Sequence, residues 1–477
     1  MSAPRKIPDE AAWNHLERQF QGELLRAPEA ARLAVGKQLA AGQPLPQPQA
    51  VARCASAADV QRALAWLDET GLNFAVRSGG HCFGDRSSSS GLVLDLSPLD
   101  CIRLDGEFVE VGPGALGGDL GLALAVHGRS VPSGGCPLVA VGGFALVGGF
   151  GLQGRSQGLL ADRVERIDLI DASGQLRAVD ADSDPDLLWG LCGAGALGFG
   201  VVTGLRLRTH KLPRLRVIFG QWSINRAAEL IERWQAHALH ADSALTLELG
   251  LQAPDLPEEA ATVEAFGAIQ CVGDTLQSLA RVESDLRRAL GPLAASLQVF
   301  DLEGEAAARY LSGLLDRCGD EAWMPSRPYR EHGYQFTRSA FHCHALTARS
   351  VDDLVRHLVE HRHYAEFREL ELVPWGGAYA RANPYSCAGP RDARMLLRHT
   401  AVVGARSLVA DQERALAWVE RSQASVGREP RRPYAGYVEA DHPQWAAACY
   451  PAALPRLRAL KQRIDPLRRF DASGLGF

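Results

Sequence analysis

Glycine-rich turns are the feature that most limits how this chain can fold. They lie at residues 77–81, 134–143, 142–154 and 190–200. Glycine clusters of this kind stand where the backbone needs dihedral angles that a side chain forbids, or where another group approaches the backbone closely. His81 ends the first cluster and Cys136 lies inside the second. An imidazole and a thiol, both nucleophilic, therefore stand where the backbone is expected to meet something, and this pairing calls for a chemical explanation.

The size and charge of the chain limit its partners. With 477 residues, of which 46% are hydrophobic, it can bury sizeable cores and is expected to form more than one domain. A net charge of -5 argues against nucleic acid or an anionic membrane as the main partner, so a small-molecule partner is predicted. The 10 cysteines show no paired metal-type spacing, so no metal site is predicted and most of them are expected to be buried reduced thiols.

The apolar segments predict a chain that stays in the cytoplasm. Residues 1–8 lack the apolar region of a secretory signal. The longest apolar stretch, Leu138 to Leu152, is too short and too rich in glycine to span a bilayer. The sequence is therefore expected to encode a soluble protein that does not enter a membrane.

Short strands alternate with helices in the first part of the chain. Apolar residues at helical spacing predict a helix over 57–70, and the strand-like run 73–76 leads from it into the first glycine turn. Further strands are predicted at 92–96 and 107–112, and a hairpin over 164–179. This order predicts an α+β or α/β unit. It is not a dinucleotide fold of the common kind, because no Gly-x-Gly-x-x-Gly closes a first strand and opens a helix.

The composition changes near residue 210. Beyond it the glycine density falls, and helical patterns are found at 227–238 and 276–290. Residues 334–344 alternate enough to predict a strand with one side facing a pocket. We place a first domain boundary near residue 210 and a second at 430–433, where two prolines flank two arginines and the chain is expected to return to the first domain.

Several motifs occur in an order that is specific to one group of enzymes. Arg77-Ser78-Gly79-Gly80-His81 comes first, and Gly134-Gly135-Cys136-Pro137 follows, continued by Val141-Gly142-Gly143. Later members of the set are Asp184 to Trp189, Phe199 to Thr203, Trp375 to Ala378 and Lys461 to Phe470. In this set the chain resembles the FAD-linked oxidases of the berberine bridge enzyme type, within the vanillyl-alcohol oxidase superfamily. The resemblance covers nearly the whole chain, and the ordered set is far more specific than any one motif.

The resemblance implies an α+β fold with two parts. A two-lobed FAD-binding domain of the PCMH type would comprise residues 1–210, with its core at about 45–210, and the C-terminal segment 431–477 that returns to it. Residues 211–430 would form an inserted substrate-binding domain, an antiparallel sheet backed by helices.

The same resemblance implies a covalently held FAD. His81 would bond to the 8α-methyl group of the flavin and Cys136 to ring carbon 6, because both carbons become electrophilic in the oxidised ring. Backbone amides of the turn that begins at Arg77 could cradle the diphosphate as an anion nest. The other expected cofactor-binding residues are Arg77, Ser78, Gly79, Gly80, Gly84, Gly135, Val141, Gly142, Gly143, Gly200, Val202 and Tyr434. The chain departs from the family at Phe144, where relatives often carry histidine, and at Ala196-Leu197-Gly198, where they carry Gly-Gly-Asn.

Oxidation of a C–H bond next to oxygen or nitrogen also needs a base for the substrate O–H proton. The resemblance implies a tyrosine near the C-terminus, and Tyr437 fits that pattern best. An alternative alignment leaves Ala440 at the base position, so that the proton acceptor must come from elsewhere. His399 falls roughly where relatives carry Glu or Gln facing the substrate, and it is the second candidate base.

Both candidate bases have a structural alternative. A phenol has an unperturbed pKa of about 10, so Tyr437 needs a nearby cation or hydrogen-bond donors to ionise. Arg431, Arg432 and His399 are candidate sources of that help. The alternative for Tyr437 is a strand tyrosine whose hydroxyl makes a structural hydrogen bond, and the alternative for His399 is a packed or surface side chain.

The combined interpretation is an FAD-dependent oxidase. It would transfer a hydride from a bulky alcohol, sugar or secondary metabolite to the flavin and pass the electrons to O2, which yields H2O2. A cytoplasmic chain fits secondary metabolism, such as antibiotic biosynthesis, better than extracellular sugar oxidation. The alternatives are a dehydrogenase that uses another acceptor, and a non-catalytic binding protein with a flavin fold, against which the presence of both His81 and Cys136 counts.

Overall fold

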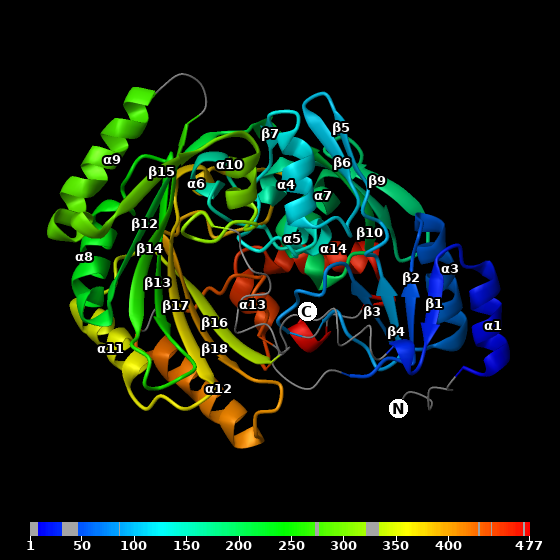
Figure 1. The fold of residues 1–477 in the computed structure, drawn as a ribbon. Coiled ribbons are helices and arrows are strands. Elements are labelled where there is room, and N and C mark those ends of the chain that lie inside the picture. Colours follow the sequence, from blue (N-terminus) through cyan, green and yellow to red (C-terminus); the bar gives the residue numbers. More distant parts are fainter. Residues whose placement is uncertain are drawn as a thin grey trace.

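The fold is described from a computed structural model of the chain. The structure describes residues 8–30, 46–84, 86–271, 276–320, 333–427, 430–439, 441–470 and 473–477. These residues form a four-stranded, a five-stranded and a seven-stranded sheet, with a two-stranded ladder, β7 (Arg129–Ser130) and β11 (His210–Lys211), between them. The seven-stranded sheet lies on one side of the molecule and the two smaller sheets on the other (Figure 1).

The four-stranded sheet carries the first glycine turn. Its order is β1 (Glu23–Arg26), β2 (Ala50–Arg53), β4 (Leu92–Asp95) and β3 (Phe74–Arg77). α1 (Glu10–Gln19) and α3 (Ala57–Thr70) share a hydrophobic core with it. Ser56 caps the N-terminus of α3, because its side chain accepts a hydrogen bond from the Asp59 amide. α3 connects β2 to β3, and both strands pair parallel with β4. This crossover brings the turn after Arg77 to the carboxyl end of the sheet.

The five-stranded sheet is antiparallel throughout. Its order is β5 (Ile102–Asp105), β6 (Phe108–Val111), β10 (Val201–Arg208), β8 (Val164–Ile170) and β9 (Leu176–Asp180). The helices that pack with it are α4 (Gly117–Ala125), α5 (Val141–Leu146) and α7 (Pro185–Ala194), whereas α6 (Gly154–Gln157) contacts the turn Gly377–Ala380 and β13 (Leu245–Ala253). The connection from β7 to α5 holds Cys136, so this side chain comes from a different sheet than His81.

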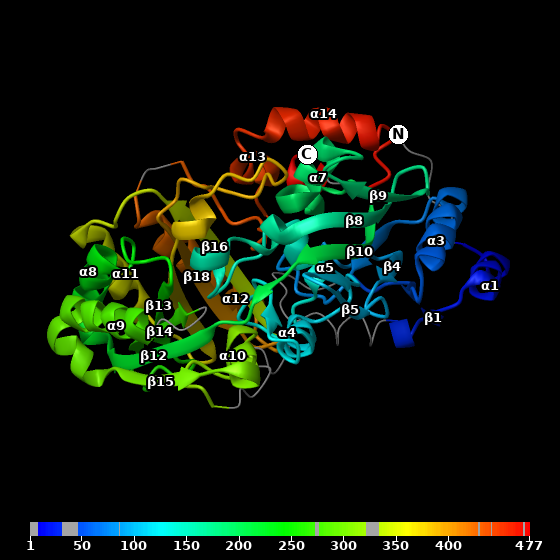
Figure 2. The same cartoon turned by 90° about the horizontal axis from the view of Figure 1, so that it is seen from above.

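The seven-stranded sheet is antiparallel and has one face covered by helices (Figures 1 and 2). Its order is β15 (Gln298–Leu302), β12 (Arg214–Ser223), β14 (Thr262–Cys271), β13 (Leu245–Ala253), β17 (Glu366–Pro374), β18 (Met395–Val403) and β16 (Tyr334–His342). The covering helices are α8 (Ala227–His237), α9 (Leu276–Leu290), α11 (Ala348–Val359) and α12 (Val409–Ala424). Leu247 and Leu249 of β13 pack in this layer, so the alternation of a strand leaves Glu248 and Gly250 on the opposite face.

From Trp445 onward the C-terminal segment packs against the five-stranded sheet, whereas Arg432 and Tyr434 are hydrogen-bonded to β16 of the seven-stranded sheet. The segment contains α13 (Trp445–Cys449) and α14 (Leu454–Ile464), and α14 lies along α7 (Figure 2). Leu457 and Leu460 join the hydrophobic core of that sheet. The buried Lys461 ammonium donates to the Phe470 carbonyl at 2.6 Å and pairs with Asp465 at 2.9 Å. Buried charge of this kind is stable only when it is paired, so the tail is held in one place.

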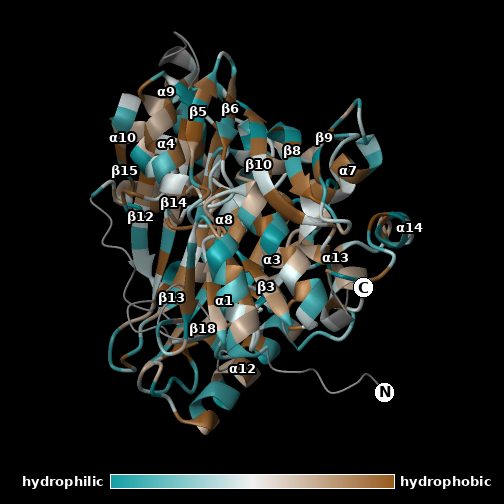
Figure 3. Cartoon of the chain, turned by 90° about the vertical axis from the view of Figure 1, so that its right-hand side faces the viewer, coloured by the Kyte–Doolittle hydropathy of each residue, from teal (hydrophilic) through white to brown (hydrophobic). Residues whose placement is uncertain are grey.

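The α+β architecture agrees with the expectation from the sequence. The predicted hairpin is present as β8 and β9, and the predicted helix 57–70 is α3. Surface helices such as α1 and α3 carry both hydrophilic and hydrophobic residues, as helices that bury one face do (Figure 3). The domain boundaries at 210 and 430 stay a prediction, and Ala440 lies outside the described residues. In the described part of the chain, no helix combines the length and the apolar character needed to cross a bilayer.

Candidate active site

A cavity of about 2290 Å³ lies where the glycine turns meet the seven-stranded sheet. It is lined by residues 78–84 and 86–88, by the turn at 134–152, by strands β13, β14, β17 and β18, and by residues 434–438. Pockets for a single small molecule measure roughly 300–1,000 Å³. The cavity can therefore hold a cofactor and a substrate together.

Arg77 shapes the first turn from behind. Its buried guanidinium donates to the Ser87 carbonyl at 3.0 Å and to the Ser88 hydroxyl at 3.1 Å. These bonds tie Ser87 and Ser88, which line the cavity, to the end of β3. At Gly79, a Cβ atom would lie only 2.8 Å from the backbone nitrogen of Ala140, so the two glycine turns approach closer than any side chain allows.

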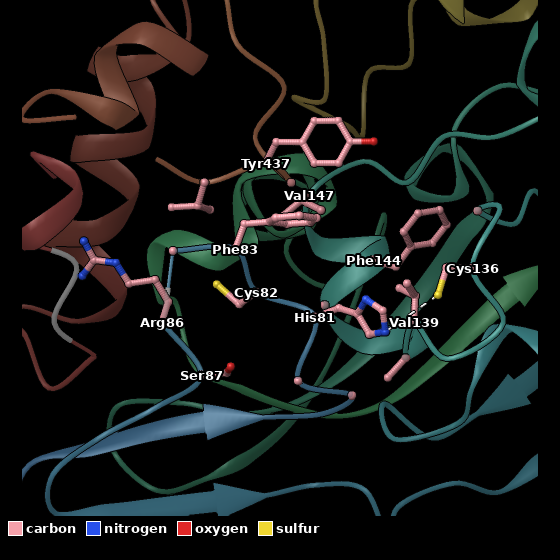
Figure 4. Close-up of a pocket in the computed structure, with 18 of the residues that line it drawn as sticks. His81, Cys82, Phe83, Arg86, Ser87, Cys136, Val139, Phe144, Val147 and Tyr437 are labelled. Atoms are coloured by element: carbon pink, nitrogen blue, oxygen red, sulfur yellow. Dashed lines mark hydrogen bonds between the residues drawn. The ribbon is translucent and has the colours of Figure 1, made fainter. Parts of the chain in front are cut away.

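His81 and Cys136 meet at one end of the cavity. The Cys136 Sγ atom lies 3.9 Å from the His81 Nε2 atom, and Figure 4 shows the two side chains next to each other. Burial lowers the pKa of His81 to about 4, so its imidazole is neutral near pH 7 and keeps a nucleophilic lone pair. Burial raises the pKa of the Cys136 thiol, and the backbone amides of Leu138 and Val139 oppose that rise. The imidazole is ready to act as a nucleophile, whereas the thiol must first lose its proton.

These residues fit a flavin cofactor. Two nucleophiles from separate sheets face one space, the backbone turns beside them have no side chains in the way, and the cavity is large enough. Of the cofactor-binding residues expected from the sequence, those that line the cavity are Ser78, Gly79, Gly80, His81, Gly84, Gly135, Cys136, Gly142, Gly143, Gly200, Val202 and Tyr434. Their contacts with a cofactor stay a prediction.

Two expected cofactor residues do not reach the cavity. Arg77 is only 1% exposed, because its side chain turns back under the loop to Ser87 and Ser88. Val141 is 2% exposed and packs into the core at the start of α5. The side chains of both residues therefore support the glycine turns from behind, and a contact of their backbone with a cofactor stays a prediction.

Tyr437 lies in the cavity across from His81 (Figure 4). Its ring packs edge-on against Phe83 at 5.4 Å and Tyr434 at 5.1 Å between ring centroids. The Arg398 guanidinium carbon lies 5.3 Å from the centre of the Tyr437 ring. Burial raises the pKa of Tyr437, and Arg398 opposes that rise. The hydroxyl of the neighbouring Tyr434 is already used, because it accepts a hydrogen bond from the Gly149 amide.

The cation beside Tyr437 is none of the three candidates from the sequence, Arg431, Arg432 and His399. Arg431 pairs with Glu439, and Arg432 pairs with Asp392 at 2.8 Å. The cation is Arg398, the neighbour of the predicted base His399.

His399 lies on the wrong face of the sheet to act as a base. It is fully buried, and its Nδ1 atom shares a hydrogen bond of 2.9 Å with the Ser422 hydroxyl on α12. Burial lowers the pKa of His399 to about 3. Because successive side chains of a strand point to opposite faces, Arg398 faces the cavity and His399 faces the helices. The expectation that His399 is a second base is therefore wrong.

The strand predicted at 334–344 also differs from expectation. It forms as β16, but it is the edge strand beyond β18, and none of its residues lines the cavity. The cavity face of the sheet is built instead by β13, β14, β17 and β18, whose charged residues sequence analysis did not single out. The pattern Glu369-Leu370-Glu371-Leu372 alternates charged and apolar residues, which predicts a strand with one charged face.

Comparison with known proteins agrees with this geometry. Residues 48–180 match a protein family described as the FAD binding domain. The uncharacterized FAD-linked oxidoreductase YgaK of Bacillus subtilis is 24% identical over 444 residues, which cover 89% of this chain and 91% of YgaK. The (R)-6-hydroxynicotine oxidase of Paenarthrobacter nicotinovorans is 36% identical over a shorter stretch, 36% of this chain and 38% of that protein.

The fold also matches solved structures. The berberine bridge enzyme of Eschscholzia californica superposes with a TM-score of 0.81 at 20% sequence identity, and the match covers 97% of this chain and 98% of that one. At this level of identity the likeness establishes the fold.

Proposed function

We propose that this chain, an FAD-linked oxidoreductase related to the berberine bridge enzyme-like proteins, is an oxidase with covalently held FAD that acts on a bulky alcohol, sugar or secondary metabolite. The observation that carries the proposal is the meeting of His81 and Cys136 at 3.9 Å in a cavity that also holds Tyr437. When bound, FAD accepts a hydride from the substrate and passes two electrons to O2, which together with two protons gives H2O2.

His81 and Cys136 would hold the flavin ring through covalent bonds. A neutral imidazole and a deprotonated thiol are the nucleophilic forms of these side chains. His81 already has its nucleophilic form near pH 7, because burial keeps its pKa at about 4. The amides of Leu138 and Val139 favour the thiolate of Cys136 once the proton has left. Two bonds from two sheets would fix the ring and leave the rest of the cavity to the substrate.

Tyr437 would take the substrate hydroxyl proton at its phenolate oxygen. The Arg398 guanidinium, 5.3 Å from the ring centre, favours the ionised phenol and is itself held by Glu369 and Glu371 at 2.9 Å each. The rings of Phe83 and Phe150 pack edge-on against Tyr437 and exclude water from one side of it.

Denaturing precipitation of the purified protein tests the attachment. Yellow colour should stay in the pellet, and peptide mass analysis should find flavin mass on the peptides of His81 and Cys136. The Cys136→Ala variant should keep the flavin on His81 alone, and the His81→Ala variant should keep it on Cys136 alone. Flavin that remains wholly in the supernatant would contradict the attachment.

The electron acceptor is tested separately. The reduced protein should reoxidise in air with formation of H2O2. Its reoxidation by air should be at least as fast as its reoxidation by an artificial dye without air. A dehydrogenase would instead react slowly with air and quickly with the dye. Anaerobic mixing with candidate alcohols and sugars should bleach the flavin for the true substrate class, and a flavin that no such compound bleaches would contradict the oxidase.

A further inference from the structure

The wall of the cavity that faces the flavin turns is strongly acidic. Alternation along the strands brings the side chains of Glu248 on β13, Glu264 on β14, and Glu369 and Glu371 on β17 to the cavity face. The register supports this, because Gly250 stands opposite Glu264 on one side and opposite Glu371 on the other. Four carboxyl groups therefore share one face at the substrate end of the cavity.

Two arginines satisfy three of these carboxyl groups. Arg398 on β18 pairs with Glu369 and Glu371, each at 2.9 Å. Arg317 reaches over from the segment after α10 (Gly304–Leu311) and pairs with Glu264 at 2.8 Å. Its guanidinium carbon lies 3.9 Å from the centre of the Phe266 ring, which fixes its plane.

Gly250 makes room for this arrangement. A Cβ atom at residue 250 would lie 3.0 Å from the Arg317 Nη1 atom, closer than ordinary van der Waals contact. The guanidinium thus lies directly on the strand, where it serves Glu264 and also approaches Glu369 at 3.4 Å. The ion pairs of the two arginines go to Glu264, Glu369 and Glu371, and none of them joins either arginine to Glu248.

Glu248 is the carboxyl group that stays without a partner. It is 6% exposed, lines the cavity, and has no hydrogen bond or ion pair with any residue that the structure describes. Burial and the nearby Glu371 raise the pKa of Glu248 to about 8, against the opposing effect of Arg317 and Arg398. A buried carboxyl group without a partner costs stability, so it is expected to serve a ligand.

We propose that Glu248 binds a protonated amine of the substrate, so that the natural substrate of this chain is a bulky compound with a basic nitrogen. This inference rests on the proposed function, because it assigns the substrate class of the same cavity. An ammonium group supplies the hydrogen-bond donors and the positive charge that the carboxylate lacks. Among the described residues, no cluster of three or more ligating side chains could hold a metal ion, so an organic cation is the better fit.

Binding of the amine should release a proton. Near pH 7 the empty site holds Glu248 mostly protonated, and a cation placed against it favours the carboxylate. The charged and titratable groups that act on Glu248, or on which it acts, are Glu369, Glu371, Arg317, Arg398, Tyr310, Tyr379 and Tyr437. The tyrosines have raised pKa values and the arginines stay charged, so neither kind of group is expected to release a proton near pH 7. Arg398 and Arg317 hold the pKa of Glu369 below its usual value, whereas burial raises the pKa of Glu371, so the released proton belongs to Glu248 and Glu371 as a coupled pair.

The test uses two probes of the same shape on the flavin-loaded enzyme. 2-Phenyl-2-propylamine is a cation at neutral pH, and 2-phenyl-2-propanol is its neutral counterpart. Neither has hydrogen on the carbon that bears nitrogen or oxygen, so oxidation there cannot disturb the measurement. Dissociation constants come from calorimetry and from the change in the flavin absorption spectrum. The wild type should bind the amine at least about tenfold more tightly than the alcohol.

The Glu248→Gln variant should lose this preference. We expect its affinity for the amine to fall about tenfold or more, while its affinity for the alcohol stays within about twofold. Glutamine resembles the protonated acid, so the fold should persist, and a thermal melt checks this. The control is Glu165→Gln, which removes a surface carboxylate that pairs with Arg208 away from the cavity and should bind the amine as the wild type does.

Calorimetry in two buffers of different ionisation enthalpy adds a measurement that needs no variant. The wild type should release close to one proton for each amine bound at pH 7, and none with the alcohol. An unchanged amine affinity in Glu248→Gln, no preference for the amine in the wild type, or no proton release would each overturn the inference. Selective amine binding without any oxidation by air would leave the inference standing and reject the oxidase, so the two failures are distinguishable.

Discussion

At Tyr437, burial and a neighbouring charge act on the phenol in opposite directions. Burial in the aromatic wall favours the neutral phenol, and Arg398 above its ring favours the phenolate. A base in this position gains from the arginine only when the substrate has displaced water, because the attraction is stronger in a dry site. We therefore expect proton transfer to begin after the substrate fills the cavity.

Removal of the phenol tests this role. The Tyr437→Phe variant should reduce the flavin with substrate about 100-fold or more slowly, because general-base catalysis contributes factors of roughly 10²–10⁴. KM should change little, and the covalent flavin should be retained. Anaerobic stopped-flow mixing measures the rate. Tyr385→Phe, which alters an exposed tyrosine outside the cavity, is the control, and equal rates in the two variants would contradict the role.

His399 should matter for stability and not for the reaction. The His399→Asn variant loses a buried ring and weakens the bond to Ser422, so the free energy of unfolding should fall by about 1–3 kcal/mol. Flavin reduction by substrate should stay within about twofold, because Arg398 and Tyr437 are untouched. Urea unfolding and stopped-flow reduction measure the two effects. A rate that drops while stability is preserved would restore His399 as a catalytic candidate.

At the scale of elements, the close approach of two turns sets the shape of the cofactor end. The turn after β3 and the segment that leads into α5 touch at Gly79 and Ala140, and this contact keeps His81 and Cys136 in one place. Packed contacts of this kind do not stretch gradually, so a small insertion displaces a whole turn.

A single methyl group should therefore disturb the cofactor end. In Gly79→Ala the added Cβ would lie 2.8 Å from the Ala140 nitrogen, so one turn must move, at a cost of about 1–3 kcal/mol. We expect less covalent flavin for each mole of protein, measured by the ratio of visible to ultraviolet absorption, and a lower melting temperature. Gly117→Ala, whose Cβ would only reach ordinary contact at 3.4 Å from the Val139 carbonyl, should behave as the wild type.

The elements also show where sequence analysis stops. The hairpin of β8 and β9 and the helix α3 follow from local patterns, and the motif order leads to His81 and Cys136. The face of a strand, however, depends on its partners. Arg398 and Glu371 lie opposite each other on neighbouring strands and form an ion pair. The sequence of either strand alone does not show this pairing, so the prediction fell on His399, one residue from Arg398.

At the scale of the whole molecule, buried neutral histidines link the fold to pH. Burial lowers the pKa of His399 and of His210 to about 3 each, and Arg163 and Arg129 add to the effect at His210. An unfolded histidine titrates near 6.5. Between these values the unfolded chain binds protons that the folded chain does not, so the stabilisation is complete above pH about 6.5 and is lost progressively as the pH falls toward 3.

Acid should therefore weaken the fold with a definite slope. Each of these histidines should lower the free energy of unfolding by about 1.4 kcal/mol for each pH unit below 6. Urea unfolding at several pH values from 7 to 4.5 measures the slope. The His399→Asn variant should show a slope smaller by about 1.4 kcal/mol per pH unit, and an identical slope would mean that His399 is already accessible to protons in the folded state.

The return of the C-terminal segment to the first sheets bears on how the protein is made. Tyr434, Tyr437 and Leu475 line the cavity, and Lys461 fastens the tail to the Phe470 carbonyl. A growing chain therefore lacks this wall until the ribosome has added Tyr434, Tyr437 and Leu475. While the wall is missing, the glycine turns of the cofactor end are already synthesised and open on that side. We expect FAD to enter through this opening before Tyr434, Tyr437 and Leu475 close it.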